Sequence, residues 1–284
     1  MDDQNSQQLF GRDNLFKLLN HLILIAIILL LAFPVYYTFV VSTLEMGEVF
    51  RLPPRIIPGT QLIDNYSQAW QNANLGRLLF NSTIFSLLVA GGKIGISILT
   101  AFALVYFDFK GKSLVFFLTL VTLMMPVPIR VVSTYDIISS FGWLNSFRGL
   151  VIPMMYSATG TFLFRQTFKQ IPRELVEATI VDGGGPLRFL WSVLLPLSKT
   201  NLAALFVILF IWSWNRYLWP LVISTDPNMH VIQLGIEAVI PAGGDALPRW
   251  NQIMPVVIFA MLPPMAVILG LQKQFVKGLI EPEK

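Results

Sequence analysis

Residues 177–196 read Glu-Ala-Thr-Ile-Val-Asp-Gly-Gly-Gly-Pro-Leu-Arg-Phe-Leu-Trp-Ser-Val-Leu-Leu-Pro. Long apolar segments flank this stretch, whereas its own charged residues do not suit the interior of a lipid bilayer. Pro172 suits the first position of a helix, and Gly183 readily takes the left-handed backbone that ends one. We therefore expect two short helices, 172–183 and 187–195, joined by a glycine turn outside the membrane.

Six segments of the chain can each supply the roughly 20 apolar residues that a helix needs to cross a bilayer. They are 18–44, 83–107, 114–132, 150–164, 202–223 and 253–271. Of the 284 residues, 55% are apolar and 13% are charged, against about 25% charged in soluble domains. The first apolar run is too long for a signal peptide, so we expect it to be retained. The sequence therefore predicts an all-α integral membrane protein with six transmembrane helices.

The basic residues predict the orientation of these segments. With the N-terminus in the cytoplasm, twelve Lys and Arg residues fall inside and six outside. The twelve are Arg12, Lys17, Lys110, Lys112, Arg165, Lys169, Arg173, Arg188, Lys199, Lys273, Lys277 and Lys284, and the six are Arg51, Arg55, Arg77, Arg130, Arg148 and Arg249. An excess of basic residues marks the cytoplasmic side, so both termini are expected there, in a bacterial plasma (inner) membrane. The predicted parts are a cytoplasmic segment 1–17, a transmembrane domain 18–272 that includes the loop 169–200, and a cytoplasmic tail 273–284.

The stretch 177–196 follows a known pattern: Glu-Ala-Ala, three residues, Gly, nine residues, Ile, one residue, Leu-Pro. Matching positions are Glu177, Ala178, Gly183, Leu195 and Pro196, while Thr179 and Val193 stand where the pattern has Ala and Ile. The stretch thus resembles the cytoplasmic EAA loop of ABC-importer permeases. Residues 198–205 and 214–221 look like the carbohydrate-uptake class of these permeases, and most of the chain resembles the second permease subunit of glycerol-3-phosphate importers.

The resemblance implies a type I permease fold and a loop that docks into an ATP-hydrolysing subunit. The loop residues to which the resemblance assigns this coupling are Glu177, Ala178, Asp182, Gly183, Leu195 and Pro196. The implied partners are a second permease subunit, two ATP-binding cassette subunits and an extracytoplasmic solute-binding protein, together with membrane lipid. A short helix pair with apolar side chains suits a partner's groove, although an amphipathic pair on the membrane surface is an alternative. Gly184 and Gly185 make the turn looser than the pattern requires.

Lys93 and Arg216 fall within predicted spans, where each costs about 2.5–3.5 kcal/mol. Both are therefore expected to face the helix bundle or an aqueous cavity. Aromatic faces with a few polar groups suit sugars and polyols. The candidate substrate path comprises Lys93, Trp214, Asn215, Arg216 and Tyr217, with Trp212 and Trp219 nearby. Two alternatives remain open: a structural role for Lys93 beside small residues, and an interfacial belt for the aromatic residues. Arg130, which follows two prolines, is expected at the outer rim.

The sequence lacks the motifs of several enzyme classes. It has no cysteine, no G-x-x-x-x-G-K-[ST] phosphate loop, no H-E-x-x-H and no G-x-S-x-G. Its two histidines, His21 and His230, are far apart in the chain. We expect no catalytic residue, metal or cofactor, and ATP hydrolysis by a separate subunit. The net charge of +4 reflects basic residues that flank the spans, so no nucleic-acid partner is expected.

The resemblance favours a sugar-like or glycerol-phosphate-like solute, and a neutral glycosyl-polyol or oligosaccharide is the alternative. A secondary transporter is a competing class, but it would need intramembrane carboxylates for ion coupling. The six predicted segments contain no Asp or Glu. A membrane-bound enzyme would need a catalytic constellation near the interface, and the sequence shows none. The prediction is therefore an importer permease driven by a partner ATPase.

Overall fold

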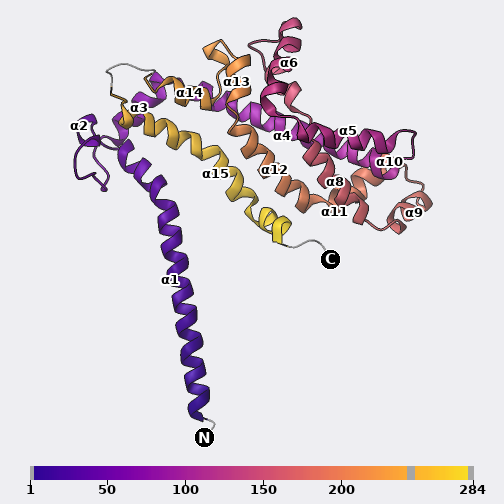
Figure 1. Cartoon of the computed structure of the whole chain (residues 1–284), viewed down its shortest axis with the longest axis horizontal. Helices are drawn as coiled ribbons and strands as arrows, with labels where there is room; N and C mark the ends of the chain where they lie inside the picture. The colour runs from indigo at the N-terminus through magenta and orange to yellow at the C-terminus, as the bar shows by residue number, and fades with distance from the viewer. Residues whose placement is uncertain (1–2, 242–246, 281–284) are drawn as a thin grey trace. The chain divides into compact units, whose positions relative to one another are not determined.

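The chain is built from helices joined by turns and short irregular segments (Figure 1). A computed structural model describes residues 3–241 and 247–280, with side chains described for 16–126, 128–241 and 247–274. Helices account for 78% of the structure, and the described residues contain no strand. The all-α prediction is therefore confirmed. The end of the predicted tail, with Lys284, lies outside the described residues, as do the side chains of Arg12 and Lys277.

Three helices in the described part of the chain are long and apolar enough to cross a membrane. They are α1 (Asp3–Ser42), within which Phe16–Ser42 is the apolar part, α4 (Leu75–Tyr106) and α15 (Trp250–Ile280). Two bent helix pairs raise the number of candidate spans to five when each pair is counted as one, among the described residues. The apolar helices of a membrane protein are thus present, and the number six remains a prediction.

The predicted span 114–132 is not one straight helix. The structure ends α5 (Lys112–Met124) at Met124 and begins α6 (Val127–Ser140) after a bend of 108°. Met125 between them has an extended backbone, with φ −76° and ψ 123°. The cause is Pro126, because a residue that precedes proline is disfavoured in the helical region and proline itself lacks the N–H for helical bonding.

The predicted span 150–164 is also interrupted. α7 (Phe147–Val151) and a turn of 3₁₀-helix, η1 (Ile152–Met154), come before α8 (Ala158–Gln170), which has only 13 residues. The Ser157 hydroxyl starts α8 by accepting a hydrogen bond from the Gly160 N–H at 3.1 Å. A serine at this position satisfies one of the amides that a helix start leaves free.

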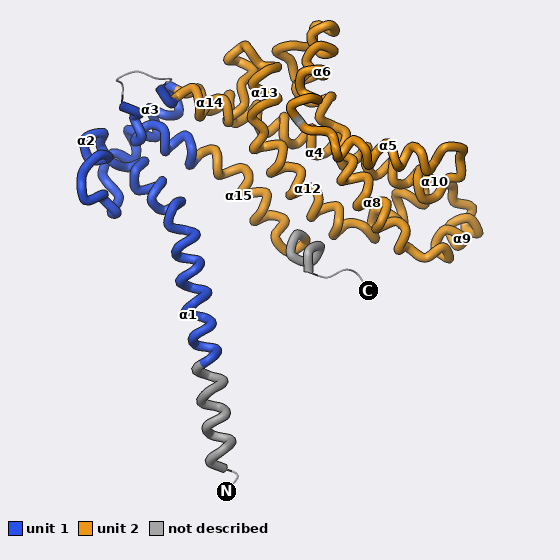
Figure 2. The backbone as a smooth tube through the Cα atoms, viewed as in Figure 1, with its two compact units in different colours: residues 1–72, 240–258 blue, residues 73–239, 259–284 orange. Residues whose placement is uncertain are grey.

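The chain divides into two compact units, drawn in different colours in Figure 2. The first unit contains residues 1–72 and 240–258, and its helices include α2 (Met46–Val49) and α3 (Leu62–Asn72). Buried Asn65 organises this unit, because its Nδ2 donates to the carbonyls of Ser42 at 3.0 Å and Leu44 at 2.9 Å. Asn251 in turn donates to Asn65 Oδ1 at 3.3 Å.

The second unit contains residues 73–239 and 259–284 and is organised around α4. Helix α4 packs against α8 and against α12 (Lys199–Trp214), side by side with both in Figure 1. Small residues allow the α4–α8 approach: a Cβ at Gly160 would lie 2.6 Å from the Ser97 hydroxyl oxygen. Membrane helices commonly use such small residues at close crossings.

Three further elements of this unit lie at one end of α4. They are α13 (Leu218–Ile223), η3 (Pro227–Met229) and α14 (Ile232–Ala238). Buried Trp219 anchors α13, because its Nε1–H donates to the carbonyl of Leu150 at 3.0 Å. Phe85 and Val89 of α4 belong to the same buried cluster, so α13 is fixed to the central helix.

Candidate functional site

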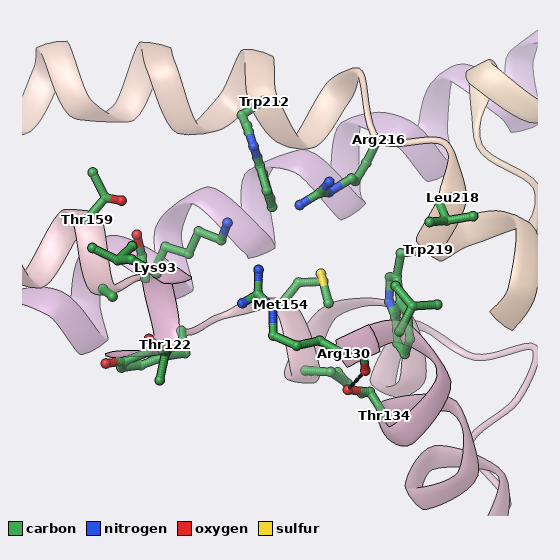
Figure 3. Close-up of a pocket in the computed structure, with 16 residues that line it drawn as sticks. Lys93, Thr122, Arg130, Thr134, Met154, Thr159, Trp212, Arg216, Leu218 and Trp219 are labelled. Carbon is green, nitrogen blue, oxygen red and sulfur yellow. Dashed lines mark hydrogen bonds between the residues drawn. The ribbon is translucent and has the colours of Figure 1, made fainter. Parts of the chain in front are cut away.

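The second unit contains a cavity of about 230 Å³ whose lining includes three basic residues, Lys93, Arg130 and Arg216. No Asp or Glu is among the residues that line it. Figure 3 shows the cationic ends of the three side chains pointing toward one another across the cavity. Charges in a membrane protein are usually paired or face an aqueous space. This cavity therefore has an uncompensated positive character.

Each of the three cations comes from a different part of the chain. Lys93 lies within α4 and is only 5% exposed. Arg130 lies in the first turn of α6, so the break at Pro126 fixes its position. Arg216 follows the last residue of α12, Trp214, by two positions, and its N–H donates to the carbonyl of Ser213 at 3.1 Å. The site is therefore assembled by tertiary packing.

Trp212 holds two of these cations. The Lys93 Nζ lies 3.3 Å and the Arg216 Cζ lies 3.5 Å from the centroid of its ring. In Figure 3 the two side chains reach the ring from opposite sides. The two positive charges are thus within about 7 Å of each other, where they repel by roughly 2 kcal/mol at an effective dielectric constant near 20. Each contact with the indole face offsets about 1–2 kcal/mol of this cost.

Uncharged polar groups complete the lining. The hydroxyl-bearing residues around the cavity are Thr122, Thr134, Tyr156, Ser157 and Thr159. Thr134 donates to the carbonyl of Arg130 at 2.6 Å, which fixes the first turn of α6. The Arg216 Nε is buried and has no hydrogen-bond partner within the described part of the chain. Cations, hydroxyls and an unused donor together suit a polyhydroxylated anion.

The structure places some of the predicted path residues in this cavity and others elsewhere. Lys93 and Arg216 line the same space. Trp214 is buried and donates from Nε1 to the carbonyl of Ala260 at 3.1 Å, and the Tyr217 hydroxyl donates to Glu237. Asn215 is exposed at the end of α12. These three residues are not among those that line the cavity.

Two lining residues were not assigned to the path from the sequence. Arg130 was expected at the outer rim, which stays a prediction, and the bend at Pro126 brings it beside the other two cations. Trp212 was named only as a neighbour of Arg216. Residues four apart on a helix lie on the same face, so this spacing could have indicated contact between the two side chains. Among the described residues, no group of three His, Asp or Glu side chains could hold a metal ion.

The loop after α8 forms the predicted helix pair. It consists of α9 (Glu174–Val181), α10 (Pro186–Phe189), the π-helical turn η2 (Leu190–Leu194) and α11 (Leu195–Leu197). Phe189 anchors it, with its ring centroid 5.1 Å from that of Tyr106. Four large apolar side chains are strongly exposed: Ile180, Val181, Leu187 and Trp191. The loop thus presents an apolar surface suited to a partner.

Most of the positions singled out in the loop are accessible to solvent. Glu177, Ala178, Asp182, Gly183 and Pro196 are exposed, and Leu195 is half-buried. Asp182 caps α9 through its N–H, which donates to the carbonyl of Ala178 at 3.0 Å. Gly183 then takes a left-handed backbone with φ +72°, which ends the helix.

Comparison with known proteins gives consistent matches. The family described as binding-protein-dependent transport system inner membrane component matches residues 93–281. The sn-glycerol-3-phosphate transport system permease protein UgpE of Rhizobium meliloti (strain 1021) is 47% identical over 275 residues, covering 94% of this chain and 97% of that protein. The protein of the same name from Yersinia enterocolitica is 46% identical, covering 93% and 96%.

Two solved structures have a similar fold. One is the crystal structure of a bacterial ABC transporter involved in the import of the acidic polysaccharide alginate, with a TM-score of 0.81 and 19% identity over 93% of this chain and 98% of that chain. The other is a bacterial alginate ABC transporter in complex with an alginate pentasaccharide-bound periplasmic protein, with a TM-score of 0.63 and 16% identity, covering 94% and 96%. At these identities the likeness concerns the fold alone.

Proposed function

The chain belongs to the family of binding-protein-dependent transport system inner membrane components, and we propose that the solute it carries is an organic phosphate such as sn-glycerol 3-phosphate. It is a permease subunit of a binding-protein-dependent ABC importer, because the family and its curated relatives, which align along almost the whole chain, are of this kind. Its helices are those of a type I permease. ATP hydrolysis belongs to a separate subunit.

The observation that carries the proposed solute is the cluster of Lys93, Arg130 and Arg216 around one cavity that no carboxylate lines. Three cations so close together are costly in a membrane unless an anion visits them. A phosphate can accept several charge-assisted hydrogen bonds at once, including both donors of one edge of an arginine fork. A neutral glycosyl-polyol would use the hydroxyls and the Trp212 face, but it gives no reason for three cations.

The organisation of the subunit belongs to the same proposal. Six helices cross the inner membrane and both termini lie in the cytoplasm, which the twelve-to-six distribution of basic residues supports. Residues 1–17 form a cytoplasmic segment, 18–272 the transmembrane domain and 273–284 a cytoplasmic tail. The complex contains a second permease subunit, two ATP-binding cassette subunits and an extracytoplasmic solute-binding protein. A structural neighbour described in complex with a periplasmic protein supports the last of these partners.

The loop 169–200 is proposed to couple the permease to its ATPase. The exposed apolar side chains of α9 and α10 support this role, because a helix pair so short needs a partner to bury them. The residues proposed to shape the contact are Glu177, Ala178, Asp182, Gly183, Leu195 and Pro196.

The proposed solute is tested by removing one charge at a time from the cavity. The complete complex is reconstituted in proteoliposomes with Arg216→Gln, Arg130→Gln or Lys93→Met, and uptake of labelled sn-glycerol 3-phosphate is measured. Loss of one charged hydrogen bond corresponds to about 1.5–3 kcal/mol, so kcat/KM should fall roughly 10- to 150-fold. Exposed Arg148, which does not line the cavity, is the control as Arg148→Gln.

Two outcomes would contradict the proposal. Wild-type uptake by an intact Arg216→Gln complex would give that residue a structural role. Calorimetric titration of the cognate binding protein supplies a second test, because a binding protein that prefers a neutral glycosyl-polyol over sn-glycerol 3-phosphate would exclude the anionic solute.

A further inference from the structure

Trp212 differs from the two tryptophans that are its neighbours in sequence. Trp214 and Trp219 are 3% and 1% exposed, and both donate from Nε1 to main-chain carbonyls. Trp212 is 39% exposed and lines the cavity. Its ring contacts are the ammonium of Lys93 and the guanidinium of Arg216. Trp212 is therefore placed to organise the cavity, whereas the other two anchor the helix packing.

An indole ring attracts the two cations without neutralising them, as a carboxylate would. Aspartate or glutamate at this place would also attract both cations, but it would neutralise their charge and use their hydrogen-bond donors. The ring face attracts a cation through its quadrupole and carries no net charge. A guanidinium stacked by its face keeps the N–H groups of its edges free. The cavity therefore stays positive, with unused donors such as the buried Arg216 Nε.

The position of the ring also joins two elements. Trp212 lies near the end of α12, and Lys93 comes from α4, which packs along α12. Arg216 lies two residues beyond the end of α12. The ring is thus the group that brings a fixed cation from one helix and a cation from a loop to the same place (Figure 3).

We propose that Trp212 is a positioning residue of the solute cavity: its indole holds Lys93 and Arg216 on either side and leaves their charges available to an anionic solute. The proposal rests on the proposed function, since it takes the solute to be an organic phosphate. It assigns the ring an indirect role in selecting anions over neutral solutes.

The test compares three substitutions in the complete complex in proteoliposomes, with KM and kcat measured for sn-glycerol 3-phosphate uptake. Trp212→Phe keeps a weaker aromatic face and should stay within roughly threefold of wild type. Trp212→Leu removes the face and should raise KM about tenfold, a ratio between those of an exposed and a desolvated cation–π contact. Trp212→Glu should lower kcat/KM further, to roughly a hundredth of the wild-type value, because the carboxylate neutralises both cations. The Trp212→Glu complex should nevertheless melt at no lower temperature than the Trp212→Leu complex, because the carboxylate pairs with both cations. Ile208→Ala, an exposed position on the same helix, is the control.

A double-mutant cycle tests whether Trp212 acts through Lys93. In a Lys93→Met background, Trp212→Leu should cost about threefold instead of about tenfold, because only the contact with Arg216 remains to be lost. Full additivity would overturn the role, as would wild-type KM in Trp212→Leu or uptake by Trp212→Glu that equals uptake by Trp212→Leu. Absence of sn-glycerol 3-phosphate uptake by the wild-type complex would instead refute the proposed solute. In that case the thermal stabilisation of the purified complex by inorganic phosphate tests Trp212 separately, and an unchanged stabilisation in Trp212→Leu would overturn its role.

Discussion

Three consecutive glycines in the proposed coupling loop, Gly183, Gly184 and Gly185, give a prediction that separates backbone conformation from packing. Gly183 has φ +72°, a region that side chains disfavour, and a Cβ there would meet no atom within 4 Å. Gly185 has an extended backbone, with φ −86° and ψ 176°, and a Cβ there would also meet open space. Alanine is therefore substituted at each of the three positions in turn.

The expected free-energy changes follow from this geometry. Alanine at Gly183 costs about 1–2 kcal/mol, because a Cβ crowds the carbonyl in a left-handed conformation. Alanine at Gly185 should be neutral, or stabilise by about 0.4–1 kcal/mol through the unfolded chain. At Gly184 a Cβ would lie 2.7 Å from Thr179 Cγ2 and 2.9 Å from its carbonyl oxygen, so alanine there should cost about 1–3 kcal/mol. Packing thus requires glycine at position 184, and only Gly185 makes the turn looser.

The assay measures solute transported per ATP hydrolysed by the reconstituted complex. A loss of about 1.4 kcal/mol lowers the ratio of native to non-native turn about tenfold. Because so short a helix pair is marginally stable by itself, Gly183→Ala should lower the solute transported per ATP several-fold, and Gly183→Val should lower it further. Gly183→Asn is the matched rescue, because asparagine tolerates the left-handed region. Membrane insertion should be normal in each variant. Equal ratios for Gly183→Ala and Gly185→Ala, both in assembled complexes, would refute the argument from backbone conformation.

Two further predictions concern packing and topology. Gly160→Ala should destabilise the subunit by about 1–3 kcal/mol, because its Cβ would lie 2.6 Å from the Ser97 hydroxyl oxygen. Thermal unfolding checks this prediction, with Gly91→Ala as the control, because a Cβ at Gly91 would meet open space. If Ser97→Gly does not restore the stability lost in Gly160→Ala, the packing argument is contradicted. A reporter fused after Lys284 should behave as cytoplasmic because of the basic asymmetry, and alkaline phosphatase activity of that fusion would place the C-terminus outside.

Local chemistry made the loop predictable from the sequence. Pro186 and Gly183 fix a helix start and a helix end through φ alone, and the structure has α9 and α10 on either side of this turn. The apolar segments 18–44 and 83–107 were equally clear, since length and hydropathy identify a long apolar helix without tertiary information. The structure extends the second of them to Leu75–Tyr106.

The interrupted segments were harder to predict because apolarity and helix continuity are different properties. Segment 114–132 is predominantly apolar, with Arg130 as its one charged residue, yet Pro126 ends its helix and redirects the chain by 108°. The cavity was harder still, since Lys93, Arg130 and Arg216 are separated in sequence by 37 residues or more and only packing brings them together. Trp214 and Tyr217 were placed in the predicted path ahead of Trp212, because sequence proximity to Arg216 does not indicate which aromatic face the guanidinium contacts.

The interruptions and the cavity are physically related. Each break frees backbone groups, and in a membrane those groups must face protein or water. Three breaks in the second unit contribute to the cavity lining: Arg130 follows the first, Pro153 and Ser157 lie at the second, and Arg216 lies at the third. Breaks that would be costly against lipid are therefore placed where a polar space accepts them. Prolines or helix ends close to basic residues inside apolar segments are accordingly the sequence signal that locates this site.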